Sequence, residues 1–230
     1  MNSFQIQIKD STNSNLAFLC ATDDRNLPFV LPFIYFASKY NPLSQFDIHI
    51  FKNIKRDYSK LNDGIRFLMN NCNVHNVNVN YVVGSNHKPQ HYRFIVHPTL
   101  NTEYTYIGDI DIMICESIKE FHLAKMKGEY VYDNELRGYS DPSRLSGLHF
   151  ASKAWFEQTY KYRQKILNEK NLEPNDEKLL ADIAKKSKVK LRPILTTQQA
   201  FNASRPIYGQ HISLSRKPFK NNSPMHVVID

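Results

Sequence analysis

Short apolar segments alternate with segments of helical period over the first half of the chain, and this order constrains the fold more than any other feature. Strands separated by helices favour an α/β domain that contains parallel strand pairs. We therefore expect a single α/β domain. The pattern predicts strands at 13–20, 46–51, 77–83 and 104–114, and helices at 29–40 and 58–69.

The second half of the chain is less regular. Residues 129–145 form a polar segment that we interpret as a loop, serving as a lid or an acceptor surface. Residues 154–170 predict a helix, and another helix is expected after Pro174 because the segment is acidic at its start and basic at its end. We find no internal repeat and no linker, so one domain over 1–230 is expected.

Composition excludes several classes of protein. With 41% hydrophobic and 12% aromatic residues the chain can bury a core, unlike a disordered segment. It has no apolar run near the roughly 20 residues of a membrane helix and no apolar signal core at its N-terminus, so we expect a cytoplasmic protein. The three cysteines are far apart, which favours reduced thiols over a disulfide framework or a thiolate zinc site.

The formal net charge of +8 favours an anionic partner. Nucleic acid, an anionic membrane surface and a phosphate-bearing substrate all fit this charge. Charge alone does not choose among them.

The motif Asp109-Ile110-Asp111 lies within an otherwise apolar run, and the alternation of a strand would place both carboxylates on one face. Burying two like charges is costly unless a cation is present. A divalent metal takes carboxylate oxygens and also bridges phosphates, so we predict a metal site here. The alternative is a strand end whose aspartates face solvent or pair with a basic residue.

Two enzyme classes place such a motif at the end of a strand. Nucleotidyltransferases of the polymerase-β type do so shortly after a Gly-Ser turn. Here Gly84-Ser85 is present, but 24 positions separate Ser85 from Asp109. A metal-dependent nucleotidyltransferase is therefore the weaker interpretation.

The other class is the nucleotide-sugar glycosyltransferases of the GT-A type, and the chain resembles glycosyltransferase family 8, which includes bacterial lipopolysaccharide galactosyl- and glucosyltransferases. Residues 19–24 (LCATDD) resemble the family's first strand and Asp-Asp turn. Residues 91–95 (HYRFI) are similar to its Tyr-x-Arg segment, which leads to the Asp-x-Asp motif. Residues 211–219 (HISLSRKPF) resemble its His-x5-Lys-Pro-Trp element, with Phe in place of Trp.

This resemblance implies a single GT-A (Rossmann-like) α/β domain, with a mixed and mostly parallel sheet flanked by helices. It also implies transfer of a hexose from a UDP-sugar to a saccharide or lipid-linked saccharide acceptor, in bacterial surface polysaccharide or lipo-oligosaccharide synthesis. It implies a nucleotide-binding half, 13–115, ending in Asp-x-Asp, and an acceptor half, 116–230, with the C-terminal metal and diphosphate element. The implied cofactor is Mn²⁺, with Mg²⁺ as an alternative. The implied metal ligands are Asp109, Asp111 and His211, and the implied nucleotide-sugar contacts are Asp23, Asp24, Arg93, Asp109 and Lys217.

Two segments depart from the family's pattern and supply the candidate catalytic residues. Residues 145–150 (LSGLHF) stand where the family has Asn-[Ala/Ser]-Gly, which makes His149 a candidate for sugar or acceptor binding, or else a buried core histidine. Residues 175–177 (NDE) stand where the family has Asp-Gln-Asp. Asp176 and Glu177 could act as a base in an inverting reaction or lie near the anomeric carbon in a retaining one, which the resemblance favours. Alternatively, they only favour the positive end of a helix.

A non-enzymatic alternative is a basic module that binds nucleic acid or another anionic polymer. If they bind no polymer, these basic residues are simply the solvated end of a helix. A third interpretation is a protein that keeps the glycosyltransferase fold but has lost the activity. We favour the enzyme and expect that the protein binds no nucleic acid. The positive charge that does not contact the diphosphate could bring the protein to the inner face of an anionic membrane. The basic residues are Lys185, Lys186, Lys188, Lys190 and Arg192.

Overall fold

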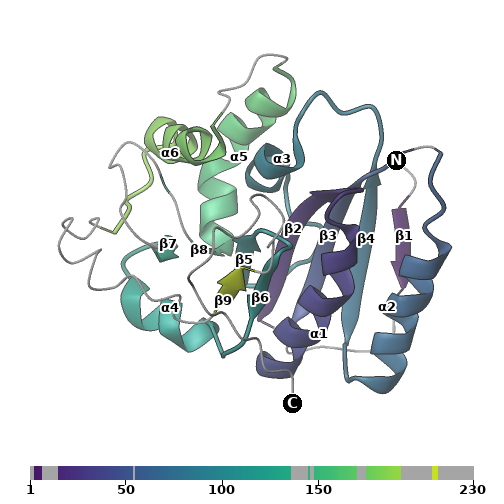
Figure 1. Ribbon diagram of the computed structural model, residues 1–230. Helices are drawn as coiled ribbons and strands as arrows, with labels where there is room; N and C mark the ends of the chain where they lie inside the picture. Colours follow the sequence, from purple (N-terminus) through teal and green to yellow (C-terminus); the bar gives the residue numbers. More distant parts are fainter. Residues whose placement is uncertain are drawn as a thin grey trace, which may run out of the picture.

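The computed structural model is an α/β fold built on a seven-stranded mixed sheet of order β1-β4-β3-β2-β5-β8-β7 (Figure 1). It describes residues 3–6, 15–53, 55–135, 145, 148–169, 175–192 and 209–211, with the first and last segments described by their backbone alone. The strands are β1 (Ser3–Ile6), β2 (Leu16–Asp23), β3 (Gln45–Phe51), β4 (Asn76–Val82), β5 (Tyr104–Gly108), β7 (Tyr132–Glu135) and β8 (Leu148–Ser152).

The sheet is mixed and mostly parallel, as predicted. The four central strands β4, β3, β2 and β5 are mutually parallel. Strand β8 is antiparallel to β5, and β7 is antiparallel to β8, so that β7 runs in the same direction as the central strands. Strand β1 is antiparallel to β4 at the other edge.

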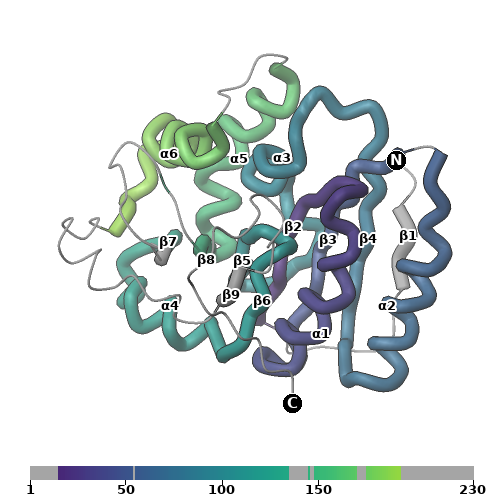
Figure 2. Tube along the Cα trace, viewed as in Figure 1, coloured from purple at the N-terminus to yellow at the C-terminus, as the bar shows by residue number. Residues whose placement is uncertain are grey.

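Helices cover both faces of the sheet, and each layer has its own hydrophobic core. The first core joins Phe18, Phe46 and Phe150 of the sheet to the helices α1, α2 and α4. The second joins Leu19, Ile107 and Ala151 to α3, α5 and α6. Helices α1 and α2 lie in front of the sheet in Figure 2. The helices are α1 (Val30–Tyr40), preceded by the 3-10 turn η1 (Leu27–Phe29), α2 (Ser59–Asn71), α3 (Pro89–Ile95), α4 (Lys119–Met126), α5 (Lys153–Leu167) and α6 (Asp176–Lys186).

The segment that follows α3 is held by buried polar groups on two sides. The carboxylate of Asp47, fully buried on β3, accepts hydrogen bonds from Asn80 Nδ2 and Thr99 N, both at 2.7 Å. The fully buried guanidinium of Arg163 donates to the carbonyl oxygen of Val96 at 2.6 Å. Burial lowers the pKa of Arg163 to about 10, so this side chain stays cationic at neutral pH. The C-terminal end of α3 is thereby fixed against the sheet.

The prediction of one strand over 104–114, with both carboxylates on one strand face, is wrong. Strand β5 ends at Gly108, residues 109–111 turn away, and β6 (Ile112–Ile114) pairs with β9 (Gly209–His211) in a separate two-stranded sheet. The turn closes through Ile112 N, which donates to the carbonyl of Asp109 at 3.3 Å. It buries Ile110 in the core and leaves Asp109 39% exposed, which keeps an ionised carboxylate in contact with solvent.

The ring of Tyr106 explains why position 108 is a glycine. A Cβ at position 108 would lie 2.2 Å from the ring of Tyr106, which is fully buried between the strands and α1. The Tyr106 ring therefore takes the space that a larger residue at 108 would need. For the same reason, a bulky apolar residue would not fit immediately before Asp109.

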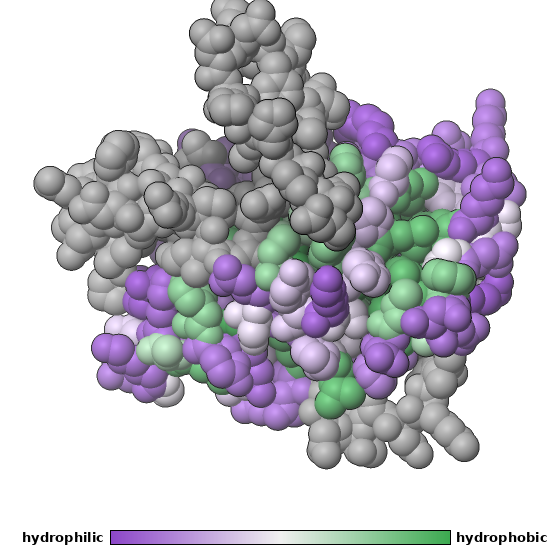
Figure 3. Space-filling view, turned by 60° about the horizontal axis from the view of Figure 1, so that its bottom comes forward, coloured by the Kyte–Doolittle hydropathy of each residue, from purple (hydrophilic) through white to green (hydrophobic). Residues whose placement is uncertain are grey.

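The segment 129–145 is a loop only in part. Its residues 132–135 form β7, which pairs with β8 as the edge of the sheet, and most of the remainder lies outside the described residues. On the face seen in Figure 3, hydrophobic and hydrophilic residues are interspersed over the described surface. None of the helices in the described part of the chain has the length and hydropathy needed to cross a lipid bilayer.

Candidate functional site

An open cavity of about 570 Å³ lies at the carboxyl ends of the parallel strands. Its walls come from the ends of β2 and β3, the loop before α3, α3 itself, the turn after β5, β8 and the start of α6. Ligands of open α/β sheets bind at this edge, because the loops that follow the strands meet there. Its position and its charged lining make this cavity the candidate site.

The cavity brings together most of the residues that the sequence predicted. They come from β2, α3, the turn after β5, β8 and α6, and α6 lies far along the chain from the first of these. The predicted residues that line the cavity are Asp23, Arg93, Asp109, Asp111, His149, Asp176 and Glu177. Asp24 is not among the lining residues, and Lys217 lies outside the described residues.

Arg93 links two walls of the cavity. Its side chain is 5% exposed, and its guanidinium forms ion pairs with Asp109 and, at 3.0 Å, with Asp176. Burial alone would lower the pKa of Arg93, but the two carboxylates outweigh burial and raise it. Arg93 is therefore a fixed cation that joins the turn after β5 to the start of α6, and Asp109 has the basic partner considered as an alternative to a metal.

Two of the three predicted metal ligands are in this cavity. Asp111 is 7% exposed and follows Asp109 in the same turn. The backbone of His211, in β9, pairs with Ile112, which directly follows Asp111. No group of three His, Cys, Asp or Glu side chains is placed for a metal among the residues whose side chains are described. The two carboxylates have the hard oxygen donors that Mn²⁺ and Mg²⁺ prefer, so the residues present fit either ion.

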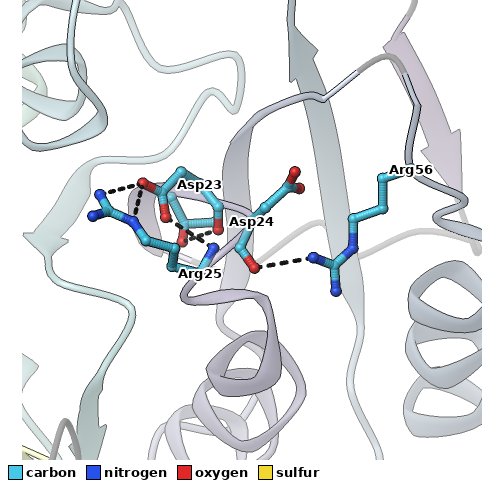
Figure 4. Close-up of polar contacts among 5 residues, drawn as sticks. Asp23, Asp24, Arg25 and Arg56 are labelled. Carbon is cyan, nitrogen blue, oxygen red and sulfur yellow. Dashed lines mark hydrogen bonds and ion pairs between the residues drawn. The ribbon is translucent and has the colours of Figure 1, made fainter. Parts of the chain in front are cut away.

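Asp23 and Asp24 have different environments at the end of β2 (Figure 4). Asp23 lines the cavity and accepts hydrogen bonds from Arg25, from the backbone N at 3.1 Å and from Nη2 at 2.7 Å. Its partial burial would raise the pKa of the Asp23 carboxyl, but the bonds from Arg25 outweigh it and lower the pKa. The Asp24 carboxylate instead accepts the hydroxyl of Tyr58 at 2.6 Å, and its carbonyl accepts Arg56 at 3.3 Å. Asp24 thus holds the turn to the start of α2.

His149 is both buried and part of the cavity wall. Its side chain, on β8, is 3% exposed, and Nδ1 lies 2.6 Å from the hydroxyl oxygen of Tyr132 on β7. The ring of Phe94, on α3, packs edge-to-face against it at 5.0 Å. His149 is thus a buried histidine that also lines the cavity, and its role in sugar or acceptor binding stays a prediction.

Asp176 and Glu177 occupy the first turn of α6, and both line the cavity. Asn175 caps this helix, since its side chain accepts the backbone N–H of Lys178 at 3.0 Å. The carboxylates are thus placed where a helix N-terminus favours negative charge, and that same end of the helix faces the cavity. A role at the helix start and a role in the cavity do not exclude each other.

Sequence reasoning missed several basic residues of the cavity wall. Arg25 is held by Asp23, while His87 and Lys88 belong to the loop before α3. His87 Nε2 donates to the carbonyl of Leu167 at 3.0 Å, which ties this loop to the end of α5. The signal that could have located the loop is Lys88-Pro89, because proline at the first position of a helix marks its start.

The basic residues 185–192 are not all free to bind a polyanion. The Nε of Arg192 donates to the buried carboxylate of Asp133 at 2.7 Å, and Lys190 pairs with Glu129 at 3.4 Å. Both contacts attach the segment after α6 to β7 and the residues before it. Part of the predicted basic surface is therefore used within the fold.

The chain shares its fold with solved structures of low sequence identity. The sequence matches no protein-family model and no curated protein. The glycosyltransferase GlyE of Streptococcus pneumoniae superposes with a TM-score of 0.55 at 13% identity, over 75% of this chain and 43% of that one. TarS of S. aureus, residues 1–349, superposes with a TM-score of 0.51 at 12% identity, over 74% of this chain and 55% of that one. The chain spans about half the length of these structures, and the superpositions establish a GT-A fold.

Proposed function

We propose that the protein is a metal-dependent glycosyltransferase that moves a hexose from a UDP-sugar to a saccharide acceptor. The observation that carries this proposal is the placement of Asp109 and Asp111 in one cavity with the fixed cation Arg93 and with Asp176. The GT-A fold, shared with the glycosyltransferase GlyE, supports it.

The chemistry of such a transfer explains why these groups would lie together. Cleavage of the bond between sugar and diphosphate leaves negative charge on the diphosphate, which fixed cations stabilise as it develops. A bound Mn²⁺ or Mg²⁺, held by Asp109, Asp111 and by proposal His211, would supply Lewis-acid stabilisation of that charge. Arg93 would keep the Asp109 carboxylate in place, Lys217 would contact the diphosphate, and Asp23 would contact the nucleotide.

The surroundings of Asp176 and Glu177, at the start of α6, bear on whether the transfer retains or inverts the configuration of the anomeric carbon. Asp176 is paired with Arg93 at 3.0 Å, which holds its carboxylate in place beside a fixed cation. A fixed negative charge suits stabilisation of positive charge at an anomeric carbon better than it suits removal of a proton. We therefore favour a retaining reaction with Asp176 and Glu177 beside the sugar.

The acceptor and location belong to the same proposal. A saccharide, or a lipid-linked saccharide of surface polysaccharide synthesis, suits a cytoplasmic enzyme that works near the inner face of a membrane. The exposed Lys185, Lys186 and Lys188 at the end of α6 have the charge for contact with anionic lipids. Lys190 and Arg192 contribute less, since both are paired within the fold.

A thermal-shift experiment with UDP tests the proposal. UDP together with Mn²⁺ should raise the melting temperature of the full chain, because a ligand that binds only the folded state stabilises it. Asp109→Asn/Asp111→Asn should lose this shift, together with the release of UDP from UDP-sugars in the presence of an acceptor mixture. Asp63→Asn is the matched control, since Asp63 forms an exposed pair with Arg66 on α2 and does not line the cavity.

Two results would count against the proposal. A double variant that keeps the Mn²⁺-dependent shift would remove the metal role from Asp109 and Asp111. Salt-dependent binding of generic RNA or DNA, without any shift from UDP and Mn²⁺, would favour the basic module instead.

A further inference from the structure

A second cavity lies at the edge of the sheet opposite the candidate site. It has a volume of about 280 Å³ and is formed by the segment between α3 and β5, the start of β5 and the start of α5. The candidate site lies at the carboxyl ends of the parallel strands, whereas this cavity lies at the amino end of β5. The two cavities share no described lining residue, so the second cavity is a separate feature of the fold.

Hydrogen bonds fix the walls of the second cavity. The backbone N of Lys153 donates to the carbonyl of Glu103 at 2.7 Å, and Lys153 Nζ donates to Asn101 Oδ1 at 3.1 Å. The hydrogen bonds already described from Thr99 N and from Arg163 hold the same segment to β3 and to α5. A site whose groups are already in place loses less conformational entropy when a ligand binds. The second cavity is therefore preformed.

Thr105 supplies a hydroxyl to this cavity. The residue is 2% exposed and lies on the same face of β5 as Ile107, which belongs to the second core. The Thr105 hydroxyl forms no hydrogen bond within the described part of the chain, and yet it is not sealed from solvent. Since the residue is otherwise buried and lines the second cavity, its hydroxyl is open to that cavity and available to a ligand.

Aromatic rings border the same cavity. His97 and Phe156 line it, and the His97 ring packs edge-to-face against Phe156 at 6.2 Å and against Tyr160 at 5.7 Å. His97 Nδ1 accepts a hydrogen bond from Arg163 at 3.3 Å, because a guanidinium only donates. Burial and the Arg163 guanidinium lower the pKa of His97, so its imidazole is uncharged at pH 7. Tyr160 is 49% exposed, which leaves ring surface open beside the cavity.

The lining suits a neutral ligand that carries several hydroxyl groups. Of the described lining residues, Lys153 and Glu157 are charged, and their charges are opposite. The threonine and asparagine side chains of the lining both donate and accept hydrogen bonds, as sugar hydroxyls do, and the C–H face of a pyranose ring packs on aromatic rings. The volume is near the lower end of the roughly 300–1,000 Å³ of ligand pockets, which suits one sugar ring better than a nucleotide. We propose that the second cavity is a non-catalytic binding site for a neutral pyranose unit of a saccharide.

Such a site would give a polymeric acceptor a second point of attachment. Thr105 and Asp109 are four residues apart, about 13 Å along an extended chain, so only an oligosaccharide could occupy both sites. Attachment at the second cavity would raise the effective concentration of the acceptor at the candidate site. That use rests on the proposed function, whereas binding of the sugar depends on the second cavity alone.

Amide NMR of the full chain, without metal or nucleotide, tests the site. Titration with glucose, galactose and N-acetylglucosamine should shift the signals of Thr99, Asn101 and Thr105. Thr105→Val should keep the melting temperature, because the hydroxyl has no partner to lose within the described fold, and it should weaken sugar binding roughly fivefold, the effect of one neutral hydrogen bond. Tyr160→Ala should also weaken binding, whereas Tyr35→Ala, at an exposed tyrosine of α1, is the matched control and should not.

Three results would overturn the proposal. They are the absence of shifts at these amides with all three sugars at their highest soluble concentrations, an unchanged sugar affinity in Thr105→Val, and a response of the same amides to inorganic phosphate instead of sugars. The proposed function is judged separately. If the sugars bind here but UDP with Mn²⁺ causes no thermal shift, the proposed function fails and this inference stands, and the reverse result has the reverse meaning.

Discussion

Replacing Asp133 by asparagine should destabilise the protein strongly, although the residue lies outside the cavity. Asp133 is fully buried on β7 and accepts hydrogen bonds from His122 Nδ1 and Arg192 Nε, both at 2.7 Å. Removing one member of a buried ionic cluster costs about 3–5 kcal/mol, because a buried charge loses its compensation. Arg192 is 22% exposed and can turn toward water, so we expect the lower end, about 3 kcal/mol.

The dependence of this loss on pH follows from the pKa of Asp133. Burial acts to raise the pKa of this carboxyl, but His122 and Arg192 outweigh burial and hold the pKa below its ordinary value of 3.8. A carboxyl whose pKa is lower in the folded state stabilises the fold above the unfolded pKa, and the contribution disappears as the pH falls through the folded pKa. The difference in unfolding free energy between the two proteins should therefore be complete at pH 7 and shrink below about pH 4.

Urea unfolding at pH 7, repeated in acid, measures this difference. For a chain of this length, 3 kcal/mol corresponds to a fall in melting temperature of roughly 6–12 °C. Glu129→Gln is the matched control, because the Glu129–Lys190 pair attaches the same segment but both side chains are more than half exposed. Its effect should stay within about 0.5 kcal/mol. A loss for Asp133→Asn of less than about 1 kcal/mol, or one no larger than the control's, would refute the reasoning.

Further substitutions test other parts of the fold and site. Gly108→Ala should cost about 1–3 kcal/mol in urea unfolding, since its Cβ would lie 2.2 Å from the Tyr106 ring; Tyr106→Leu in the same chain should recover part of that loss, and strictly additive effects would exclude the steric reason. Asp23→Asn should weaken the UDP-induced thermal shift, because Asp23 lines the cavity, whereas Asp24→Asn should leave it, because Asp24 is bonded to Tyr58. Equal effects of these two aspartate substitutions would contradict that distinction.

The regular elements of the first half were predictable because their signals are local. The predicted strand 46–51 is β3 (Gln45–Phe51), and the predicted helix 58–69 is α2 (Ser59–Asn71). Hydrophobic periodicity did not predict where β5 ends. The alternating pattern continues through 104–114, but β5 ends at Gly108, and residues 109–111 form a turn that is closed by the hydrogen bond from Ile112 N to the carbonyl of Asp109.

Strand β7 was missed for a different reason. Its sequence, YDNE, is polar and resembles a loop, yet Tyr132 and Asp133 are buried. Their partners are His149 on β8, His122 on α4 and Arg192 beyond α6, and no local pattern reveals these contacts. Strand pairing that depends on distant polar partners cannot be inferred from the period of the hydrophobic residues.

The candidate site was partly predictable, since the family resemblance supplied residue types in order. Its arrangement was not, because the contacts join residues that are far apart in the chain. The roles given to the predicted residues stay predictions. The pairing of Arg93 with Asp109, which lies 16 positions away, and with Asp176, 83 positions away, is a property of the fold.

The ion pair between Arg93 and Asp176 affects the order in which the chain can fold during synthesis. During synthesis, β2 to β5 emerge well before α6, so Arg93 first meets only one of its two carboxylate partners. A buried guanidinium with incomplete compensation opposes compaction of the region around it. The arrival of Asp176 therefore completes the ion pairs of Arg93 and one wall of the cavity together, and a chain that ends before α6 would lack this wall even though β2 to β5 had all been made.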